Sequence, residues 1–411
     1  MMRLRVMAAV LTIPTALATT AGCGDSERGI KPDDTATTED TAGGDTAVGD
    51  TAGGDTTTTT TLPNACEGDG DCSSGHCRSG VCVVDPPTGA TSAITDPNEN
   101  VPTTDPPDLS CIDQTDAPVT QTTTTTLYGA VVRFGDGRKT ENMKVDVLLA
   151  EGFDPSVCDG MSEDDARDCY FGEEIGTVVG SATSVLPEEP AVAPSCEEGH
   201  HEECDLGFQC VEDSSVVFIC ELQFGLYEIA DVPLNTPLIL RTQALSNQNR
   251  WHDTWTFNVI LRDDQEVDGK VQYDATMVSD GQWLLTPNTV GLTAGITDGH
   301  GVVGGRVRDC RGDDRDSWPI GDVTIGLANP PIKTVFFNNL EDDTVPLIDR
   351  ESTNILGRFA ALDIAPGWNR IAGAARVGDT VVSVGSAPVY VFPNALTIVS
   401  WPGRQPFWRQ N

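Results

Sequence analysis

Cysteine is the main residue type in this chain whose side chain could form covalent bonds. The sequence contains thirteen cysteines, and twelve of them lie at or beyond Cys66. An even number of cysteines in an exported chain indicates disulfides. Cys23 stands apart, and its thiol would be left over if nothing modified it. We therefore expect up to six disulfides, drawn from Cys66, Cys72, Cys77, Cys82, Cys111, Cys158, Cys169, Cys196, Cys204, Cys210, Cys220 and Cys310.

Few other residues could carry a reaction. The five histidines include one adjacent pair, His200 and His201. Adjacent side chains of an extended chain point to opposite sides, so a solvated loop competes with a metal site there. The acidic turn 263–269 offers the carboxylates that calcium prefers but lacks the ligand spacing of an EF-hand loop. Catalytic motifs such as Gly-x-Ser-x-Gly and His-Glu-x-x-His are absent, so we expect no catalytic residue, no metal and no cofactor.

The N-terminus has the pattern of an export signal. Arg3 and Arg5 precede an uncharged apolar run over residues 6–18, which is too short to span a bilayer core of about 30 Å. The sequence Ala-Gly-Cys then ends at Cys23. This ending resembles the signal of bacterial lipoproteins, although Thr20 stands where an aliphatic residue is usual.

The resemblance implies that residues 1–22 are a signal peptide and that Cys23 carries the lipid. It also implies an exported protein, held by its lipid anchor in a bacterial cell envelope, at the outer membrane or cell surface. Ordinary signal cleavage near Ala18 or Ala21 is the alternative.

Charge and aromatic content divide the chain into a tether and a body. The net charge of -38 excludes a nucleic-acid partner, which would need clustered Lys and Arg. Every aromatic residue lies at or beyond Tyr128, so the first 127 residues cannot build a large core. Residues 23–65, with Thr/Asp/Gly repeats, predict a disordered acidic spacer, and residues 83–126, rich in Pro and Thr, predict a second, extended linker.

Between these linkers, residues 66–82 form a small cysteine-rich module. It is too short for a core and needs disulfides, for which three pairings are open. A metal site that uses His76 is the alternative, although zinc favours Cys-x2-Cys spacing. The cluster 196–220 looks like a looser copy, and both resemble small disulfide modules of bacterial surface proteins.

The body has the pattern of a mainly β protein. Apolar and polar residues alternate over 254–261, as a half-buried strand requires. Short apolar runs follow one another through the body, separated by Gly, Pro, Asn and Asp.

The body is also duplicated. Gly225-x-Tyr227 with Asp231-Val232 matches Gly357-x-Phe359 with Asp363-Ile364, and Gly129-x-Val131 matches Gly305-x-Val307. The first copy is longer by a stretch that holds the second cysteine cluster.

These motifs resemble the carboxypeptidase regulatory-like family, whose fold is a transthyretin-type β-sandwich. The resemblance implies two β-sandwich domains in tandem. The first covers 127–262 with a Cys-rich insertion at 154–221, and the second covers 301–401. A connector spans 263–300 and a tail spans 402–411. Trp401, at the end of the second sandwich, and Trp408, in the tail, are candidates for an exposed binding contact, with burial in the core as the alternative.

The leading hypothesis is a non-enzymatic cell-envelope lipoprotein with a structural or adhesive role towards an unknown protein or glycan partner. The alternative is an accessory or inhibitory subunit of an exported hydrolase such as a peptidase, by analogy with the sandwich attached to carboxypeptidases. A metal-dependent enzyme that uses His200 and His201 is a third hypothesis.

The lipid anchor can be tested directly. We expect Cys23→Ala to move the protein from the membrane pellet to the supernatant on ultracentrifugation, because stable anchoring needs the acyl chains. Thr20→Leu, which restores the usual aliphatic residue, should keep the protein in the pellet. Unchanged membrane retention of Cys23→Ala would contradict lipidation at Cys23.

Overall fold

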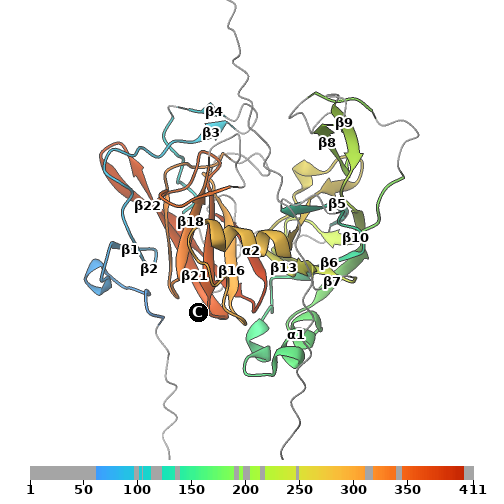
Figure 1. Ribbon diagram of the computed structural model, residues 1–411, viewed down its shortest axis with the longest axis horizontal. Helices are drawn as coiled ribbons and strands as arrows, with labels where there is room; N and C mark the ends of the chain where they lie inside the picture. The colour runs from blue at the N-terminus through green and yellow to red at the C-terminus, as the bar shows by residue number, and fades with distance from the viewer. Residues whose placement is uncertain are drawn as a thin grey trace, which may run out of the picture. The chain divides into compact units, whose positions relative to one another are not determined.

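The computed structural model describes residues 62–96, 101–103, 105–112, 123–134, 139–188, 194–197, 204–212, 218–246, 250–310, 318–338 and 345–401. All of them belong to one unit, Thr59–Asn411. The described fold is mainly β, as expected (Figure 1). Cys23 and residues 24–61 of the expected spacer lie outside the described residues, as do His200, His201 and Trp408. The last four residues of the spacer, 62–65, are described, and Asn64 donates from its backbone to the Ala328 carbonyl at 2.8 Å.

The first sandwich packs two sheets over one apolar core. One sheet has the order β10 (Leu226–Pro233), β5 (Thr124–Phe134), β15 (Ala275–Ser279), β12 (Trp251–His252), and β14 (Lys270–Gln272) also pairs with β5. The facing strands are β13 (Thr254–Val259), β11 (Leu238–Ala244), β6 (Met143–Leu149) and β7 (Val178–Thr183). Strands β14 and β15 lie within residues 263–300, expected as a connector, and they complete this sandwich.

The second sandwich repeats that plan. Its first layer runs β19 (Pro346–Leu347), β18 (Lys333–Phe337), β20 (Arg358–Ile364), β16 (Gly301–Val307), β23 (Leu396–Trp401), and its second layer runs β17 (Thr324–Leu327), β21 (Gly367–Val377), β22 (Thr380–Val391). The duplicated motifs meet in the same way in both copies, since Tyr227 pairs with Gly129 and Phe359 pairs with Gly305.

Steric contacts explain why glycine occupies both of these paired positions. A Cβ on Gly129 would lie 2.0 Å from the Tyr273 carbonyl oxygen, and a Cβ on Gly305 would lie 1.6 Å from that of Val399. In each copy, a parallel neighbour strand therefore approaches too closely for a side chain.

One strand joins the two sandwiches. Strand β23 pairs in parallel with β16 on one side and with β13 on the other. The first layer of the second sandwich and the β13–β11–β6–β7 layer of the first thereby form a single nine-stranded sheet. The two sandwiches predicted from the sequence are present, and they share this sheet.

The insertion into the first copy packs against β6, β11 and β13, on the face of the shared sheet that points away from β5 and β15. It contains the 3-10 helix η2 (Pro155–Cys158), helix α1 (Glu163–Phe171) and the Cys158–Cys169 disulfide. Ser162 caps α1 by accepting a hydrogen bond from the backbone of Asp165. Tyr170 meets the ring of Phe392 edge-on at 5.2 Å, so α1 contributes to the core of the second sandwich.

A buried ion pair lies beneath this insertion. Arg241 and Asp146 are both 1 % exposed, and Arg241 Nη2 lies 2.7 Å from Asp146 Oδ2. Arg241 also donates to the Tyr170 carbonyl at 2.7 Å, and its guanidinium lies over the rings of Phe171 and Trp255. One arginine therefore links β11, β6 and the end of α1.

The two cysteine modules share one pairing pattern. In each module the first cysteine bonds to the third and the second to the fourth: Cys66–Cys77 with Cys72–Cys82, and Cys196–Cys210 with Cys204–Cys220. Each forms a hairpin in which the third and fourth cysteines face each other, in β1 (His76–Arg78) with β2 (Val81–Val83) and in β8 (Phe208–Glu212) with β9 (Phe218–Leu222).

The first module and part of the following segment pack on the second sandwich. Val81 and Val83 join Ala328, Ala372 and Ala374 in an apolar cluster, which replaces the core that the module lacks. Ile94, next to the short β3 (Thr95–Asp96)–β4 (Val101–Pro102) ladder, is fully buried. The Cys111–Cys310 disulfide attaches the segment a second time. Within 83–126, which we expected to be an extended linker, the described residues are thus largely docked.

Trp401 is not an exposed binding residue, and that expectation was wrong. Its side chain is 1 % exposed, packs edge-on against Phe359 and donates from Nε1 to the Gly385 carbonyl. It belongs to β23 and points to the inner face of the shared sheet, where its large apolar surface is removed from water. In the part of the chain that the structure describes, helices with the length and apolar character needed to cross a membrane are not found.

The buried ion pair supports a stability prediction. We expect Arg241→Leu to lower the free energy of unfolding in urea by up to about 3–5 kcal/mol, because the buried Asp146 carboxylate would keep only Lys144, at 3.0 Å, and the Ser181 hydroxyl as side-chain partners. As a control, Lys270→Met removes an exposed pair with Glu228 and should cost no more than about 1 kcal/mol. Equal losses in the two variants would show that the buried pair has no special role.

Candidate functional site

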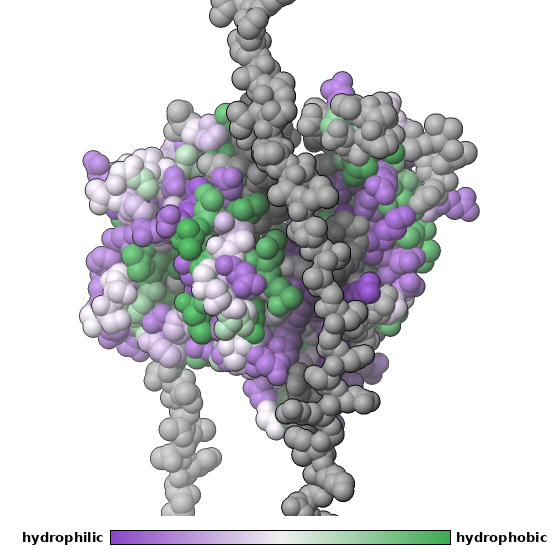
Figure 2. Space-filling model, viewed as in Figure 1, coloured by the Kyte–Doolittle hydropathy of each residue, from purple (hydrophilic) through white to green (hydrophobic). Residues whose placement is uncertain are grey.

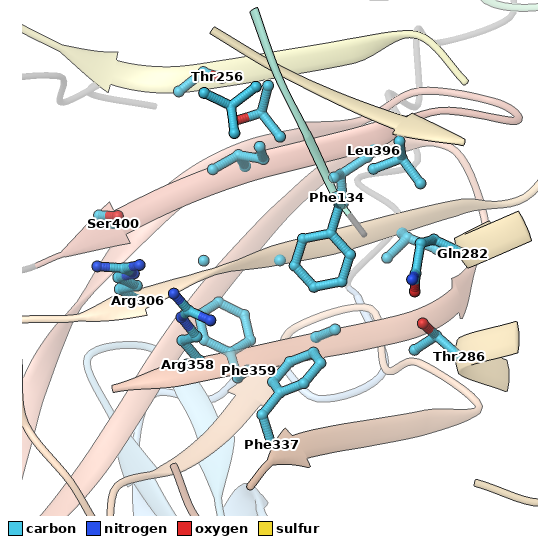
Figure 3. A pocket seen from close by; sticks show the side chains of 18 of the residues that line it. Phe134, Thr256, Gln282, Thr286, Arg306, Phe337, Arg358, Phe359, Leu396 and Ser400 are labelled. Carbon is cyan, nitrogen blue, oxygen red and sulfur yellow. The ribbon is translucent and has the colours of Figure 1, made fainter. Parts of the chain in front are cut away.

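A cleft of about 390 Å³ lies on the outer face of the second sandwich. Its floor is formed by β20, β16 and β23, and β5 and β15 of the first sandwich and helix α2 (Asp280–Thr289) line its other sides. The cleft exists because the β5–β15 layer covers only its own half of the shared sheet. Figure 3 shows the side chains that line it.

The alternation of side chains along each strand determines which residues form the floor of the cleft. Every second residue of a strand points to the same face, so Val302, Gly304 and Arg306 of β16 point into the cleft. Gly304 pairs with Ala360 and Ile398, and Arg306 pairs with Arg358 and Ser400. The cleft therefore changes along its length, from a charged row through a row of small and apolar residues to the apolar row that begins at Val302.

The charged end gathers arginines. Arg306 and Arg358 lie directly opposite each other on antiparallel strands (Figure 3). Arg308 and Arg133 also line the cleft, and Arg133 donates to the Gln223 side-chain oxygen at 2.7 Å. Among the described lining residues the only carboxylate is Asp274, whose Oδ1 accepts from the Ala130 backbone at 3.0 Å.

The other end of the cleft is apolar. Val302 pairs with Leu396 on the floor, and Leu362 lies two residues beyond Ala360 on β20. Phe134 and Phe337 meet edge-on at 6.3 Å along one wall. Gln282 and Thr286 of α2 lie at the edge of this end in Figure 3.

Helix α2 closes the apolar end. Ser279 caps it by accepting from the Gln282 backbone, and Trp283 packs against an apolar cluster that includes Val302 and Phe337 of the sheet. On the solvent side, Leu284 and Leu285 are each more than half exposed. Apolar side chains also gather on this face of the molecule in Figure 2.

Small residues keep the middle of the cleft open. A Cβ on Gly304 would meet only ordinary contacts, 3.5 Å from Leu396 Cδ1 and 3.6 Å from the Phe359 carbonyl oxygen. A larger side chain at this position would therefore enter the cleft without clashing with the backbone. Gly304 thus differs from its neighbour Gly305, where the backbone leaves no room.

Two residues with titratable side chains, His252 and Asp253, contact residues at the apolar end of the cleft. His252 stacks on Trp283 with the ring centres 4.1 Å apart, and burial lowers the pKa of this imidazole despite its hydrogen bond to the Asn394 carbonyl. The backbone carbonyl of Asp253 accepts from Leu396 at 3.0 Å. Burial raises the pKa of the Asp253 carboxyl to about 6, and the half-exposed Arg167 guanidinium opposes this shift only in part.

The residues singled out in the sequence lie elsewhere. The twelve cysteines form disulfides, and the cysteine groups whose atoms are close enough to share an ion consist of these bonded cysteines. The acidic turn starts in the 3-10 helix η5 (Asp263–Gln265), where Asp264 pairs with Arg262. Sequence reasoning missed the cleft, although Arg306 and Arg358 stand beside the very glycines used to recognise the repeat.

Comparisons with known proteins return only distant structural likenesses. No family model and no curated protein matches the chain. Among solved structures, the minor pilin GBS52 of Streptococcus agalactiae is 10 % identical, with 70 % of this chain and 99 % of that chain covered and a TM-score of 0.17. The shaft pilin SpaA of Lactobacillus rhamnosus GG is 9 % identical over 67 % and 96 % of the two chains, with a TM-score of 0.16. The Bacillus anthracis TIE protein is 7 % identical over 69 % and 34 %, with a TM-score of 0.16. TM-scores this low carry no weight for the function of this chain.

The buried Asp253 carboxyl predicts a pH dependence. Because its pKa is higher in the folded chain than the usual 3.9, its contribution to stability is present at low pH and is lost as the pH rises through about 6. We expect Asp253→Asn to abolish this loss. Relative to the unchanged protein, the variant should gain roughly 2–3 kcal/mol in the free energy of unfolding between pH 4 and pH 7.

Urea titrations at both pH values measure this gain. Asp263→Asn, which makes the same change at an exposed carboxyl of η5, serves as the control. If Asp253→Asn behaves like this control, the carboxyl is not desolvated in the folded chain.

Proposed function

We propose that this chain is a non-enzymatic binding protein of the cell envelope, exported and held by a lipid on Cys23, whose cleft captures an acidic ligand. The observation that carries the proposal is the Arg306–Arg358 pair: the two arginines are direct cross-strand partners, and both line one end of an open cleft. Guanidinium groups bind carboxylates and phosphates through paired hydrogen bonds.

The rest of the cleft favours binding over catalysis. The described lining contains neither histidine nor cysteine, and the carboxylate of Asp274 holds a backbone amide. A hydroxyl such as that of Ser400 would need a neighbouring base to act as a nucleophile, and histidine and lysine are not among the described lining residues. The six disulfides among the described residues support export, because disulfides persist in oxidising compartments.

The charge of the whole chain supports selectivity for this site. The protein carries 63 acidic and only 25 basic residues, so its surface as a whole repels anions. An acidic ligand would therefore find an attractive potential mainly where arginines gather. A structural or adhesive role at the cell surface follows if the ligand belongs to a neighbouring cell, matrix or envelope component.

The test compares the full-length protein with a variant in which the cleft is filled. We expect Gly304→Leu to weaken binding by at least about tenfold in calorimetric titrations, because the leucine side chain would occupy the middle of the cleft. The ligand panel covers acidic oligosaccharides, acidic peptides, sulfated and phosphorylated small molecules, and alkyl acids. Gly70→Leu is the matched control, since a Cβ at Gly70 meets nothing within 4 Å.

The proposal stands if at least one acidic class binds the unchanged protein and Gly70→Leu but not Gly304→Leu. Circular dichroism in the near ultraviolet checks that both variants remain folded. Failure of every acidic class to bind, or equal binding to all three proteins, would contradict a ligand site in the cleft.

A further inference from the structure

We infer that the ligand of the cleft is a single-chain amphipathic acid, with a carboxylate or phosphate head on the arginines and an alkyl chain along the floor. This inference rests on the proposed function and names the chemical class that the same cleft would take. It is drawn from the order of the rows along β16, β20 and β23.

The head site is built from three side chains. Arg306 and Arg358 are cross-strand partners, and Ser400 is the partner of Arg306 on its other side. Each guanidinium carries five N–H donors, so it can hold a protein group and a ligand oxygen at once. A carboxylate or phosphate between the two arginines would accept paired hydrogen bonds, and the Ser400 hydroxyl could add another.

The floor next to the head site has the surface that an alkyl chain needs. Gly304, Ala360 and Ile398 form the middle row, and none of their side chains can hydrogen-bond. A glycan or an extended peptide would bring hydroxyl or amide groups over this row and leave them without partners, which costs binding energy. An alkyl chain has no such groups.

The far end of the cleft continues the apolar path. Val302, Leu362 and Leu396 follow on the floor, and Trp283 of α2 lies beyond them. Four residues along a strand separate Arg306 from Val302, which is about 13 Å at roughly 3.3 Å per residue. The cleft therefore suits a medium-length chain, and its volume of about 390 Å³ is in the range of small-molecule sites.

Titration calorimetry of the full-length protein with octanoate, decanoate, dodecanoate and hexadecanoate, all below their micelle-forming concentrations, tests the inference. We expect one bound molecule per chain and an affinity that rises by up to about fourfold for each added methylene until the chain reaches α2. Dodecyl phosphate tests the alternative head group. Dodecanol and acetate, which lack the head and the chain respectively, should bind at least about tenfold more weakly than dodecanoate.

Variants separate the two ends of the site. Arg306→Gln and Arg358→Gln should each weaken dodecanoate by about tenfold or more and leave dodecanol unaffected. Gly304→Leu should weaken dodecanoate and decanoate alike. Arg370→Gln, on β21 in the other layer of the second sandwich, is the matched control and should bind as the unchanged protein does.

Three outcomes would overturn the inference. Alkyl acids that fail to bind while an acidic glycan or peptide binds in a Gly304-dependent manner would refute the ligand class and leave the proposed function intact. Binding of alkyl acids without dependence on either arginine would refute the head site. Association with phosphatidylglycerol vesicles that persists in Gly304→Leu, with no binding of free alkyl acids, would assign the attraction to a membrane surface instead.

Discussion

The parallel pairing of β23 with both β16 and β13 is the constraint on which the rest of the structure depends. This strand is the last of the described chain, yet it lies at the centre of a nine-stranded sheet. Because one strand belongs to both ladders, the two sandwiches cannot turn relative to each other without breaking backbone hydrogen bonds. The outer face of the second sandwich is therefore held beside β5, β15 and α2, and the cleft between them has fixed walls.

The insertion in the first copy serves the same junction from the opposite face. Trp255 of β13 stacks on Phe392 at 3.9 Å, and α1 adds Tyr170 to the same aromatic group. Arg241 and Asp146 lie under this group, where an unpaired charge would be costly. Arg241 bonds both to Asp146 of β6 and to the Tyr170 carbonyl of α1, so its remaining hydrogen-bonding capacity favours docking of the insertion at this position. The cleft on one face and the insertion on the other thus rely on a single shared sheet.

Much of the architecture could be read from residue patterns. The mainly β class followed from alternation, and the repeat followed from Gly129, Gly305, Tyr227 and Phe359, which the structure places in matching ladders. Both cysteine modules were expected to contain disulfides, but the sequence did not predict which cysteines pair, because spacing alone does not decide which sulfur atoms meet. Trp401 was misjudged since a tryptophan near a predicted tail can equally be the inner residue of a final strand. The cleft was missed because Arg306 and Arg358 stand 52 positions apart and become neighbours only through the β16–β20 ladder.

The sequence by itself determined the properties that depend on composition and local order. These are the acidic balance, the lack of aromatic residues before Tyr128, the cysteine content and the strand-forming alternation, each of which acts within a short stretch of chain. Tertiary structure alone decided that the two copies share a sheet, that the first module borrows its core from Ala328, Ala372 and Ala374, and that arginines line one end of a cleft. The physical reason is that strand pairing and side-chain burial bring together residues far apart in the chain, and no local pattern records which partner a strand will take.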